Sequence, residues 1–560
     1  MENENTVLTR RGFLETLGQA AGGSVLIRAV AAMGIGQGVV ACGGSAAAST
    51  PPLPTGGSTP STPVIPPGPA TPGNLINSPL DPTRIKPEDW PAGVGNGTRV
   101  LILGAGIAGM SAAYELVKLG YDCTILEATE RAGGRCQTIR SGDVIEETDS
   151  TQICDFDSED DLYFNPGPAR IPHHHENLLR YCRLFGVKLE PFANDSRGAL
   201  FHSQNQPDGE PQTARRIKAD TRGKISELLA GIVQQDQLDI PLSSQDKVNL
   251  LGMLSEFGDL NASLRYAGSD RAGFSGQENV GESDRSTLQS SLTLDELLDA
   301  GFWRSQAEFS ESINQQPMML QPVGGMDNIA RAFEARVADD IVFGAVVSDI
   351  TKTATGVTVT YTENGLSRVI ESDYCVCTIP ASVLSSISSN ISDAHQQAIS
   401  GFVYTRANKV AFQSRRFWEQ DHHIYGGISW TDQDITQIWY PSHGLGSQQG
   451  VLVGAYTFSQ GAGDRFSNMA PAARVAKARA EGLALHPEYT EEVSRGISKS
   501  WPKTPYQLGA WGVSDPGILT RPDGPIHFAG EHLSVLQGWQ EGAILSAYRA
   551  IDSIVRTSLA

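Results

Sequence analysis

Cysteine is scarce in this chain, and its scarcity excludes two ways of stabilising a fold. The 560 residues include seven cysteines, an odd number, and no two of them form a CxxC pair. This spacing supports neither a disulfide framework nor a zinc motif. The seven are Cys42, Cys123, Cys136, Cys154, Cys182, Cys375 and Cys377. Because Cys375 and Cys377 lie in an apolar run, we expect them inside a strand rather than on a metal.

An excess of positive charge is also absent. Lysine and arginine number 43 against 63 acidic residues, which gives a net charge of -20. Because binding to phosphates needs a basic surface, nucleic acid is excluded as a predicted partner. There are no internal repeats, and the apolar stretch near the N-terminus is diluted by glycine and Arg28, which argues against a spanning helix. The length predicts two or three domains.

Residues 1–42 resemble an export signal rather than part of the fold. Arg10 and Arg11 precede a modest apolar stretch, and the sequence VVAC ends at Cys42. This pattern resembles a twin-arginine signal with a lipobox, which predicts export to the periplasm or cell surface and a lipid anchor on Cys42. An ordinary secretory signal is the alternative. Residues 43–85 are rich in Ser, Pro, Gly and Thr and are predicted to form a linker.

The stretch that begins at residue 99 predicts a dinucleotide site. A short apolar strand leads into GxGxxG, a helical pattern follows, and a second strand ends at Glu127. Gly104 permits a tight turn, Gly106 lets the backbone approach a pyrophosphate, and Gly109 allows the helix to pack closely on the strand. The helix N-terminus favours phosphate, and Glu127 stands where an acid that binds a ribose hydroxyl is expected. An adenine dinucleotide is therefore predicted.

Two further segments favour FAD over NAD. ERAGGR, residues 130–135, resembles the second pyrophosphate loop of the flavin amine oxidase family, in which Arg135 would neutralise phosphate or face the flavin. A surface turn is the alternative for the Gly-Gly pair alone. Residues 526–551 resemble the closing strand, Gly-Glu loop and helix of the same family. The matching pieces span residues 99–551.

The resemblance implies which residues would contact the cofactor. QPVGGMDNIARAF (321–333) resembles the Gly-Gly-Met helix start of the family, and residues 341–350 resemble the strand that packs on adenine. No cysteine lies in the loop before Gly538, where covalent members carry their flavin link, so we expect non-covalent FAD. The predicted contacts are Gly104, Gly106, Ala108, Gly109, Glu127, Ala128, Gly134, Arg135, Gly167, Pro168, Ala169, Arg170, Val347, Gly530, Glu531, Gly538 and Trp539.

The fold class predicted by this resemblance is α/β. A Rossmann-type FAD-binding domain would be assembled from discontinuous segments, beside a mixed α+β substrate domain and a helical subdomain. The expected bounds are 97–162, 315–385 and 500–560 for the FAD-binding domain, 163–205 and 386–499 for the substrate domain, and 206–314 for the helical subdomain.

The segment FNPGPARIPHHHENLLRYC, residues 164–182, indicates the substrate class. Its Gly-Pro-x-Arg-Ile-Pro part resembles the L-amino acid oxidase version of this region, whose arginine pairs with the substrate carboxylate; that arginine is Arg170 here. The guanidinium group has two parallel N–H donors that match the two oxygens of a carboxylate. An amine oxidase has no need of such an arginine, because its substrate carries no carboxylate. The alternative is that Arg170 pairs with a structural acid or with the nearby acidic segment.

The run His173–Glu176 suggests a metal site, but we predict none. Adjacent helical side chains point in different directions, so only His173 and Glu176 would share a face. We expect the histidines in the polar first turn of a helix that Gly186 ends. The buried stripe of that helix is expected to be Leu178, Leu179, Cys182 and Phe185.

The resemblance implies further site residues. Lys409 aligns with the family lysine that holds a water beside the flavin and assists reoxidation by oxygen. Tyr440 resembles the tyrosine that gives the substrate carboxylate a second bond, beside another aromatic residue, Trp439. The predicted catalytic residues are therefore Lys409, Arg170 and Tyr440, and the predicted substrate contacts are Arg170, Tyr440, Trp511, Gly538 and Trp539.

The predicted function is oxidative deamination of L-amino acids. Hydride would pass from Cα to FAD, giving a 2-oxo acid, ammonia and, with oxygen as second substrate, hydrogen peroxide. Three alternatives stay open: an amide-forming monooxygenase, an amine or polyamine oxidase, and a flavin-bearing surface protein that binds a partner. A homodimer is one option for the oligomeric state. The acidic segment 143–161 is expected to be a solvated loop.

Overall fold

A parallel sheet organises the half of the molecule that contains both the first and the last described strands. The computed structural model describes residues 86–206, 209–275, 287–303 and 306–559; the predicted export signal, the linker and Cys42 lie outside them. The strand order is β12-β2-β1-β16-β23, and every neighbouring pair is parallel. The strands are β1 (Arg99–Leu103), β2 (Asp122–Leu126), β12 (Ile341–Val342), β16 (Tyr374–Cys377) and β23 (Ile526–Phe528).

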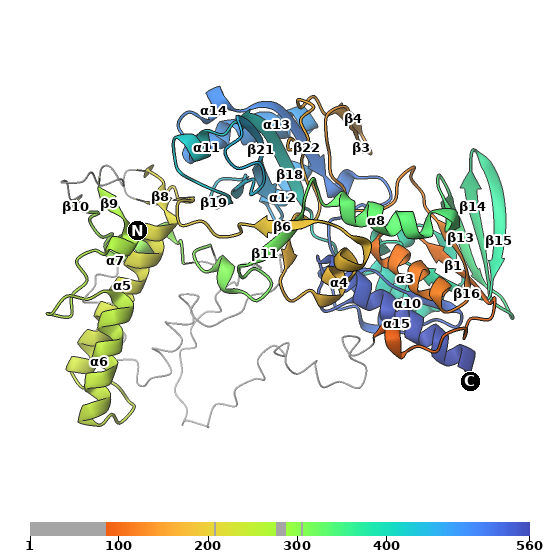
Figure 1. Cartoon of the computed structure of the whole chain (residues 1–560), viewed down its shortest axis with the longest axis horizontal. Coiled ribbons are helices and arrows are strands. Elements are labelled where there is room, and N and C mark those ends of the chain that lie inside the picture. The colour runs from red at the N-terminus through yellow and green to blue at the C-terminus, as the bar shows by residue number, and fades with distance from the viewer. Residues whose placement is uncertain (1–85, 207–208, 276–286, 304–305, 560) are drawn as a thin grey trace, which may run out of the picture.

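Both faces of this sheet are covered, which is why its strands are almost wholly apolar. Val100 and Ile102 of β1 pack into a core made largely by four helices, whereas Leu101 and Leu103 pack into a second core on the opposite face. Those four helices lie together in Figure 1: α3 (Ile107–Lys118), α4 (Glu176–Phe185), α8 (Asp327–Val337) and α15 (Gln540–Leu559).

The second core joins the parallel sheet to a smaller sheet of order β15-β14-β13-β17. Buried Ile350, Val357 and Val359 supply its apolar face. The elements concerned are β13 (Val346–Lys352), β14 (Val357–Glu363), β15 (Leu366–Ser372), β17 (Ser388–Ser389), α9 (Ala381–Leu384) and α10 (Asp393–Ser400). The α/β class with a Rossmann-type sheet is confirmed.

A seven-stranded sheet forms the other half, in the order β22-β18-β21-β20-β19-β7-β8. Its strands are β7 (Leu200–His202), β8 (Gln212–Thr213), β18 (Asn408–Arg415), β19 (Gly427–Thr431), β20 (Gln437–Tyr440), β21 (Gln449–Thr457) and β22 (Ser494–Ser500). The helices of this half are α11 (Phe417–Gln420), α12 (Ala462–Ser467), α13 (Pro471–Glu481) and α14 (Tyr489–Glu492). A three-stranded sheet, β5 (Ile171–Pro172), β11 (Met319–Pro322) and β6 (Leu189–Phe192), lies between the two halves (Figure 1).

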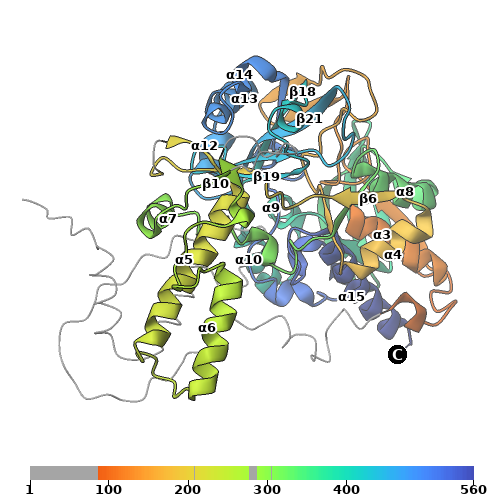
Figure 2. The same cartoon turned by 60° about the vertical axis from the view of Figure 1, so that its left-hand side comes forward.

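The described residues of the segment predicted to be helical form three helices, of which two make a projecting pair. Figure 2 shows α5 (Ala214–Gln234) and α6 (Ser244–Gly258) side by side, extending away from the sheets. The third, α7 (Leu294–Ala300), begins at a capping box of Thr293 and Glu296. The same region holds the short hairpin of β9 (Phe274–Ser275) and β10 (Thr287–Leu288). None of the described helices combines the length and the apolarity that crossing a bilayer requires.

The acidic segment is not the solvated loop that we expected. Strand β3 (Val144–Glu147) pairs with β4 (Ser150–Ile153), and the hairpin lies against β22. Glu147 is the reason: its carboxylate is fully buried, pairs with Arg474 and accepts a hydrogen bond from the Ser500 amide at 2.8 Å. The sequence pattern hides this because Arg474 lies more than 300 residues away.

Short 3₁₀ helices make up the remaining regular structure of the described residues. They are η3 (Pro87–Asp89), η5 (Asp270–Ala272), η6 (Phe309–Glu311), η7 (Ala338–Asp340), η8 (Gly482–Ala484), η9 (Trp501–Lys503), η10 (Gly517–Thr520) and η11 (Glu531–Leu533).

Candidate active site

One cavity of about 510 Å³ gathers nearly all the predicted site residues. It is lined by the loop between β1 and α3, by residues 166–170, and by strands of the seven-stranded sheet. Among the predicted residues, only Gly109 and Tyr440 do not line it. Those that do are Gly104, Gly106, Ala108, Glu127, Ala128, Gly134, Arg135, Gly167, Pro168, Ala169, Arg170, Val347, Lys409, Trp511, Gly530, Glu531, Gly538 and Trp539.

The glycines at the start of α3 have the separate tasks that the sequence suggests. Gly104 has a φ of 104°, which other residues rarely adopt. A Cβ on Gly109 would lie 2.0 Å from the carbonyl oxygen of Gly104, so this glycine serves packing rather than the cavity. A Cβ on Gly106 would meet nothing within 4 Å. The backbone of Gly106 is therefore open to the cavity, at the N-terminus of a helix.

Glu127 connects the two loops of the dinucleotide end. One carboxylate oxygen accepts a hydrogen bond from the Ala105 amide at 2.8 Å, and the other accepts one from the Thr129 amide at 3.0 Å. Val347 lines the same end. A cavity with an open glycine and a helix N-terminus along its wall suits a dinucleotide with a pyrophosphate in the middle. These residues fit FAD.

The N-terminal and C-terminal segments meet through an ion pair. Nη1 of Arg135 lies 2.7 Å from one oxygen of Glu531, and Arg135 also donates to the carbonyl of Ala510. The other Glu531 oxygen accepts from the Gly538 amide at 2.7 Å. Gly538 has a φ of 81°, so the turn before α15 depends on glycine. Arg135 therefore stabilises the Gly530–Gly538 turn through Glu531.

At the opposite end of the cavity, two cations lie on one aromatic ring. The guanidinium carbon of Arg170 is 4.4 Å from the centre of the Trp439 ring, and Nζ of Lys409 is 4.9 Å from it. Both residues are buried, with 5% and 2% of their surfaces exposed. Nζ of Lys409 also donates to the carbonyl oxygens of Asn165 at 3.0 Å and Gly167 at 2.8 Å.

Aromatic side chains form the walls around these cations. Trp511 and Trp539, both predicted, line the cavity together with Trp439 and Tyr456. Sequence reasoning missed Tyr456, yet the strand pairing offers a signal for it, because Tyr456 of β21 lies directly opposite Lys409 of β18. Phe309, from the segment between α7 and β11, also lies 5.5 Å from Arg170. The helical region therefore packs against the buried guanidinium of Arg170, although Phe309 itself does not line the cavity.

Tyr440 is a correction to the prediction. Side chains alternate along β20, so Trp439 faces the cavity and Tyr440 faces the other side of the sheet. The Tyr440 hydroxyl is fully buried, 2.7 Å from Oγ of Ser429 and 2.6 Å from Nε2 of His486, and burial raises its pKa. Tyr440 therefore does not lie where it could bind a carboxylate in the cavity.

The histidine run also differs from the prediction, because α4 begins only at Glu176. His173 is exposed, and Nε2 of His174 lies 3.0 Å from the side-chain oxygen of Asn314. His175 is buried with its ring 5.1 Å from that of Trp539, and burial lowers its pKa to about 3. The three rings precede the helix and do not form its first turn.

Cys136 is a further lining residue that the sequence did not single out. Its sulfur accepts a hydrogen bond from Nε2 of Gln540 at 3.0 Å and donates one to the carbonyl of Met326 at 3.1 Å. Burial raises the pKa of this thiol to about 12. The six cysteines among the described residues are all buried and free of disulfides.

Known proteins resemble this chain along most of its length. The family described as flavin containing amine oxidoreductase matches residues 107–555. A flavin-dependent L-tryptophan oxidase from Lentzea aerocolonigenes is 29% identical over 492 residues, which cover 81% of this chain and 98% of that protein. An L-amino-acid oxidase from Siganus canaliculatus is 27% identical over 83% of this chain and 87% of its own.

Solved structures agree on the fold. A putrescine oxidase bound to putrescine superposes with a TM-score of 0.54 at 19% identity, over 82% of this chain and 99% of that one. Because the family match covers far more than half of the sequence, and the cavity fits the cofactor, the chain belongs to the flavin-containing amine oxidoreductases.

Proposed function

We propose that this oxidoreductase removes hydride from the Cα of L-amino acids. The observation that carries the proposal is the pair of buried cations, Arg170 and Lys409, on the Trp439 ring inside the cavity. An arginine remains charged at any physiological pH, and its attraction for an anion is strong where water is excluded. This end of the cavity favours a carboxylate.

The same charges disfavour a substrate that carries only an ammonium group. Of the described acidic residues, only Glu127 and Glu531 line the cavity. Glu127 holds two backbone amides, and Glu531 holds Arg135 and the Gly538 amide. Both carboxylates are therefore bound to donors of the protein itself rather than open to a substrate ammonium group. An amino acid brings its own carboxylate to this end.

The residues of the chain then perform three tasks. Arg170 binds the carboxylate with two donors and thereby orients Cα. The carbonyl oxygen of Gly538 accepts a hydrogen bond from the substrate amine, and the aromatic walls exclude water. Lys409, held by two carbonyl oxygens, positions a water at the end where oxygen reacts. A bound FAD supplies the hydride acceptor and returns the electrons to oxygen as hydrogen peroxide.

The product of the cavity is an imino acid, which water hydrolyses to a 2-oxo acid and ammonia. The walls of Trp439, Tyr456, Trp511 and Trp539 favour large apolar side chains on the substrate. An amide-forming monooxygenase would use the same clamp, and the release of carbon dioxide would reveal it.

The test uses the full-length protein with its flavin bound. Under anaerobic conditions, we would mix it with L-phenylalanine, L-leucine and L-lysine, and in parallel with the amines that lack their carboxylates. Bleaching of the flavin by L-phenylalanine and L-leucine alone is the expected result. Bleaching by the amines at equal or higher rates would refute the carboxylate clamp. Peroxide and 2-oxo acid in equal amounts would then separate an oxidase from a monooxygenase.

Three further proposals concern the state of the protein. Non-covalent FAD is supported by the lack of a cysteine in the loop before Gly538, and release of all flavin on acid precipitation would test it. Export by the twin-arginine route and a lipid on Cys42 concern residues outside those described; labelling with a fatty acid, compared between wild type and Cys42→Ser, would test the anchor. A homodimer would be tested by sedimentation.

A further inference from the structure

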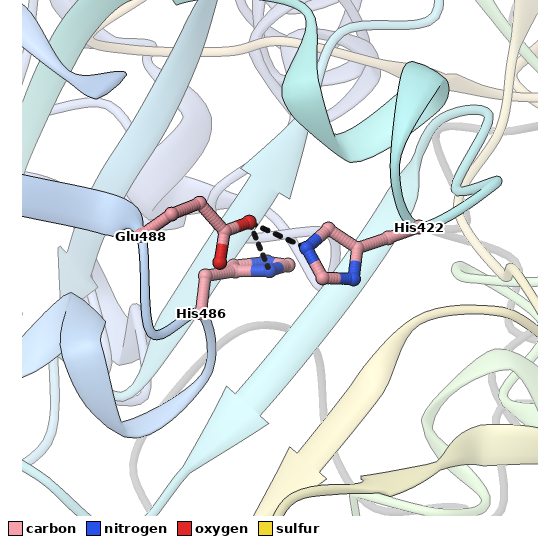
Figure 3. A group of neighbouring side chains, drawn as sticks. All are labelled: His422, His486 and Glu488. Carbon is pink, nitrogen blue, oxygen red and sulfur yellow. Dashed lines mark hydrogen bonds and ion pairs between the residues drawn. The ribbon is translucent and has the colours of Figure 1, made fainter. Parts of the chain in front are cut away.

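Two histidines and a glutamate come together on the side of β20 that faces away from the cavity. His422 follows α11, and His486 and Glu488 lie in the connection between η8 and α14. Among the described residues, these three alone form a group in which one ligand atom from each lies within 4.8 Å of the others. Figure 3 shows both rings directed toward the carboxylate.

The distances are close to those of a metal site. Nε2 of His422 lies 2.5 Å from Oε1 of Glu488, and Nδ1 of His486 lies 4.0 Å from the same oxygen. A tetrahedral zinc ion with bonds of about 2.0–2.1 Å needs ligand atoms about 3.3 Å apart. The first contact would therefore lengthen by roughly 0.8 Å and the second shorten by roughly 0.7 Å. Rotation of the partly exposed Glu488 and His422 side chains can provide both changes.

A second observation points to a ligand. His486 is fully buried, and its Nδ1 atom has no hydrogen-bond partner although it is directed toward Glu488. A buried polar atom without a partner is costly, so it calls for an explanation such as an ion. The ion pair between His422 and Glu488 alone would leave this nitrogen unsatisfied.

The surroundings of His486 provide the second hydrogen bond that a metal-ligating histidine typically makes. Its other nitrogen, Nε2, lies 2.6 Å from the Tyr440 hydroxyl, which lies 2.7 Å from Oγ of Ser429. A ligating histidine typically donates its second ring N–H to such an acceptor, which fixes the tautomer and the ring orientation. In this arrangement, Nε2–H donates to Tyr440, Tyr440 donates to Ser429, and Nδ1 presents its lone pair.

We propose that His422 Nε2, His486 Nδ1 and a carboxylate oxygen of Glu488 bind one divalent ion of the zinc class, with water in the remaining position. Two imidazoles and one carboxylate suit zinc and its borderline neighbours rather than calcium or magnesium, which prefer oxygen ligands throughout. The side chains of His422 and Glu488 are 29% and 28% exposed, which leaves a path for the ion and room for the water.

The position of the site suggests what the ion would do. It would tie the loop after α11 to the connection before α14, directly behind Tyr440. The neighbouring residue in β20 is Trp439, the ring on which Arg170 and Lys409 lie. The ion would therefore stabilise the sheet that forms the substrate end of the cavity without touching the substrate. This inference does not depend on the substrate proposed above.

The test measures metal binding directly. Untagged full-length protein, purified with its flavin, would be stripped with a chelator and titrated with Zn²⁺ by calorimetry and with Co²⁺ by visible absorption. We expect one ion per chain, intense Co²⁺ bands typical of low coordination, and a higher Tm with Zn²⁺. His422→Asn and Glu488→Gln should each weaken Zn²⁺ binding by about 100-fold or more, because even outer partners of a ligand contribute about 10- to 100-fold.

Neighbouring residues provide matched controls. His423→Asn and Glu491→Gln remove an exposed histidine and an exposed glutamate next to the site, and both should bind Zn²⁺ like the wild type. Absence of stoichiometric binding would overturn the proposal. So would equal binding by the His422 and Glu488 variants, which would place the ion elsewhere, for instance on the run His173–His175. A variant that binds weakly but keeps the wild-type flavin spectrum and apo-state Tm has lost a ligand rather than its fold.

Discussion

Replacing Arg170 with methionine should separate amino acids from amines as substrates. The change removes a buried guanidinium that lies 4.4 Å from the Trp439 ring but keeps much of the side-chain volume. Removing one partner of a buried, hydrogen-bonded charge pair costs about 2–5 kcal/mol. At about 1.36 kcal/mol for each factor of ten, kcat/KM for an L-amino acid should fall by about 30- to 5000-fold.

The direction of the effect should reverse for an amine that lacks the carboxylate. Removing Arg170 removes a repulsive charge, so the decarboxylated analogue should react as fast as with the wild type or faster. Anaerobic stopped-flow reduction of the flavin measures both substrates in one preparation. Arg368→Met, on the exposed strand β15, is the matched control and should change neither rate. An equal loss for both substrates, with the flavin still bound, would refute the clamp.

Four other changes have clear expected outcomes. Gly106→Ala should fold with an unchanged Tm in the apo state but lose most of its flavin absorbance, because a Cβ there fits the protein and projects into the cavity. Glu147→Gln should lower the free energy of unfolding in urea by about 3–5 kcal/mol, because Arg474 keeps a buried charge without its partner. Tyr440→Phe should leave kcat/KM within about two-fold and cost about 1 kcal/mol of stability, because its hydroxyl bonds lie outside the cavity. Burial lowers the pKa of Lys499 from 10.5 to about 8. Between these two pH values the unfolded chain binds more protons than the folded one, so Lys499 makes the free energy of unfolding rise with pH. Lys499→Met should therefore show a flatter dependence of the urea midpoint on pH over that window.

Controls for these changes come from the same elements or from equivalent positions. Gly231→Ala, where a Cβ also meets nothing within 4 Å, should keep its flavin. Glu146→Gln removes the exposed neighbour of Glu147 and should leave the urea midpoint unchanged. Flavin loss in Gly231→Ala, or full stability in Glu147→Gln, would contradict the reasoning. So would a large loss of activity in Tyr440→Phe with normal stability.

The parts of the molecule that short motifs encode could be predicted. GxGxxG, the following helix and Glu127 depend on local spacing, and the structure places Gly104, Gly106 and Glu127 at one end of the cavity. Arg170 between two prolines also lines it. Tyr440 and Trp439 show where local reasoning fails, because adjacent strand residues face opposite sides of the sheet. An assignment that is wrong by one residue therefore places a core side chain in the cavity.

The remaining features depend on contacts between distant segments. From the sequence alone, Glu147 belongs to an acidic loop. Only the structure shows that Arg474 and the Ser500 amide bind its carboxylate. His422 and His486 are 64 residues apart in numbering, whereas the conspicuous run His173–His175 does not converge. No local pattern distinguishes a histidine that joins such a cluster from one that does not. Pairing of Tyr456 with Lys409 likewise appears only once β18 and β21 are in register.

The interleaved order of the parallel sheet has a consequence for biosynthesis. Strand β1 pairs with β16 about 270 residues later, and β16 pairs with β23 about 150 residues after that. Glu531, the partner of Arg135, is made after that strand. A nascent chain therefore cannot close the cofactor cavity until both β23 and Glu531 have been synthesised. Capture of flavin must follow the synthesis of both segments, and the non-local pairing makes that assembly slow.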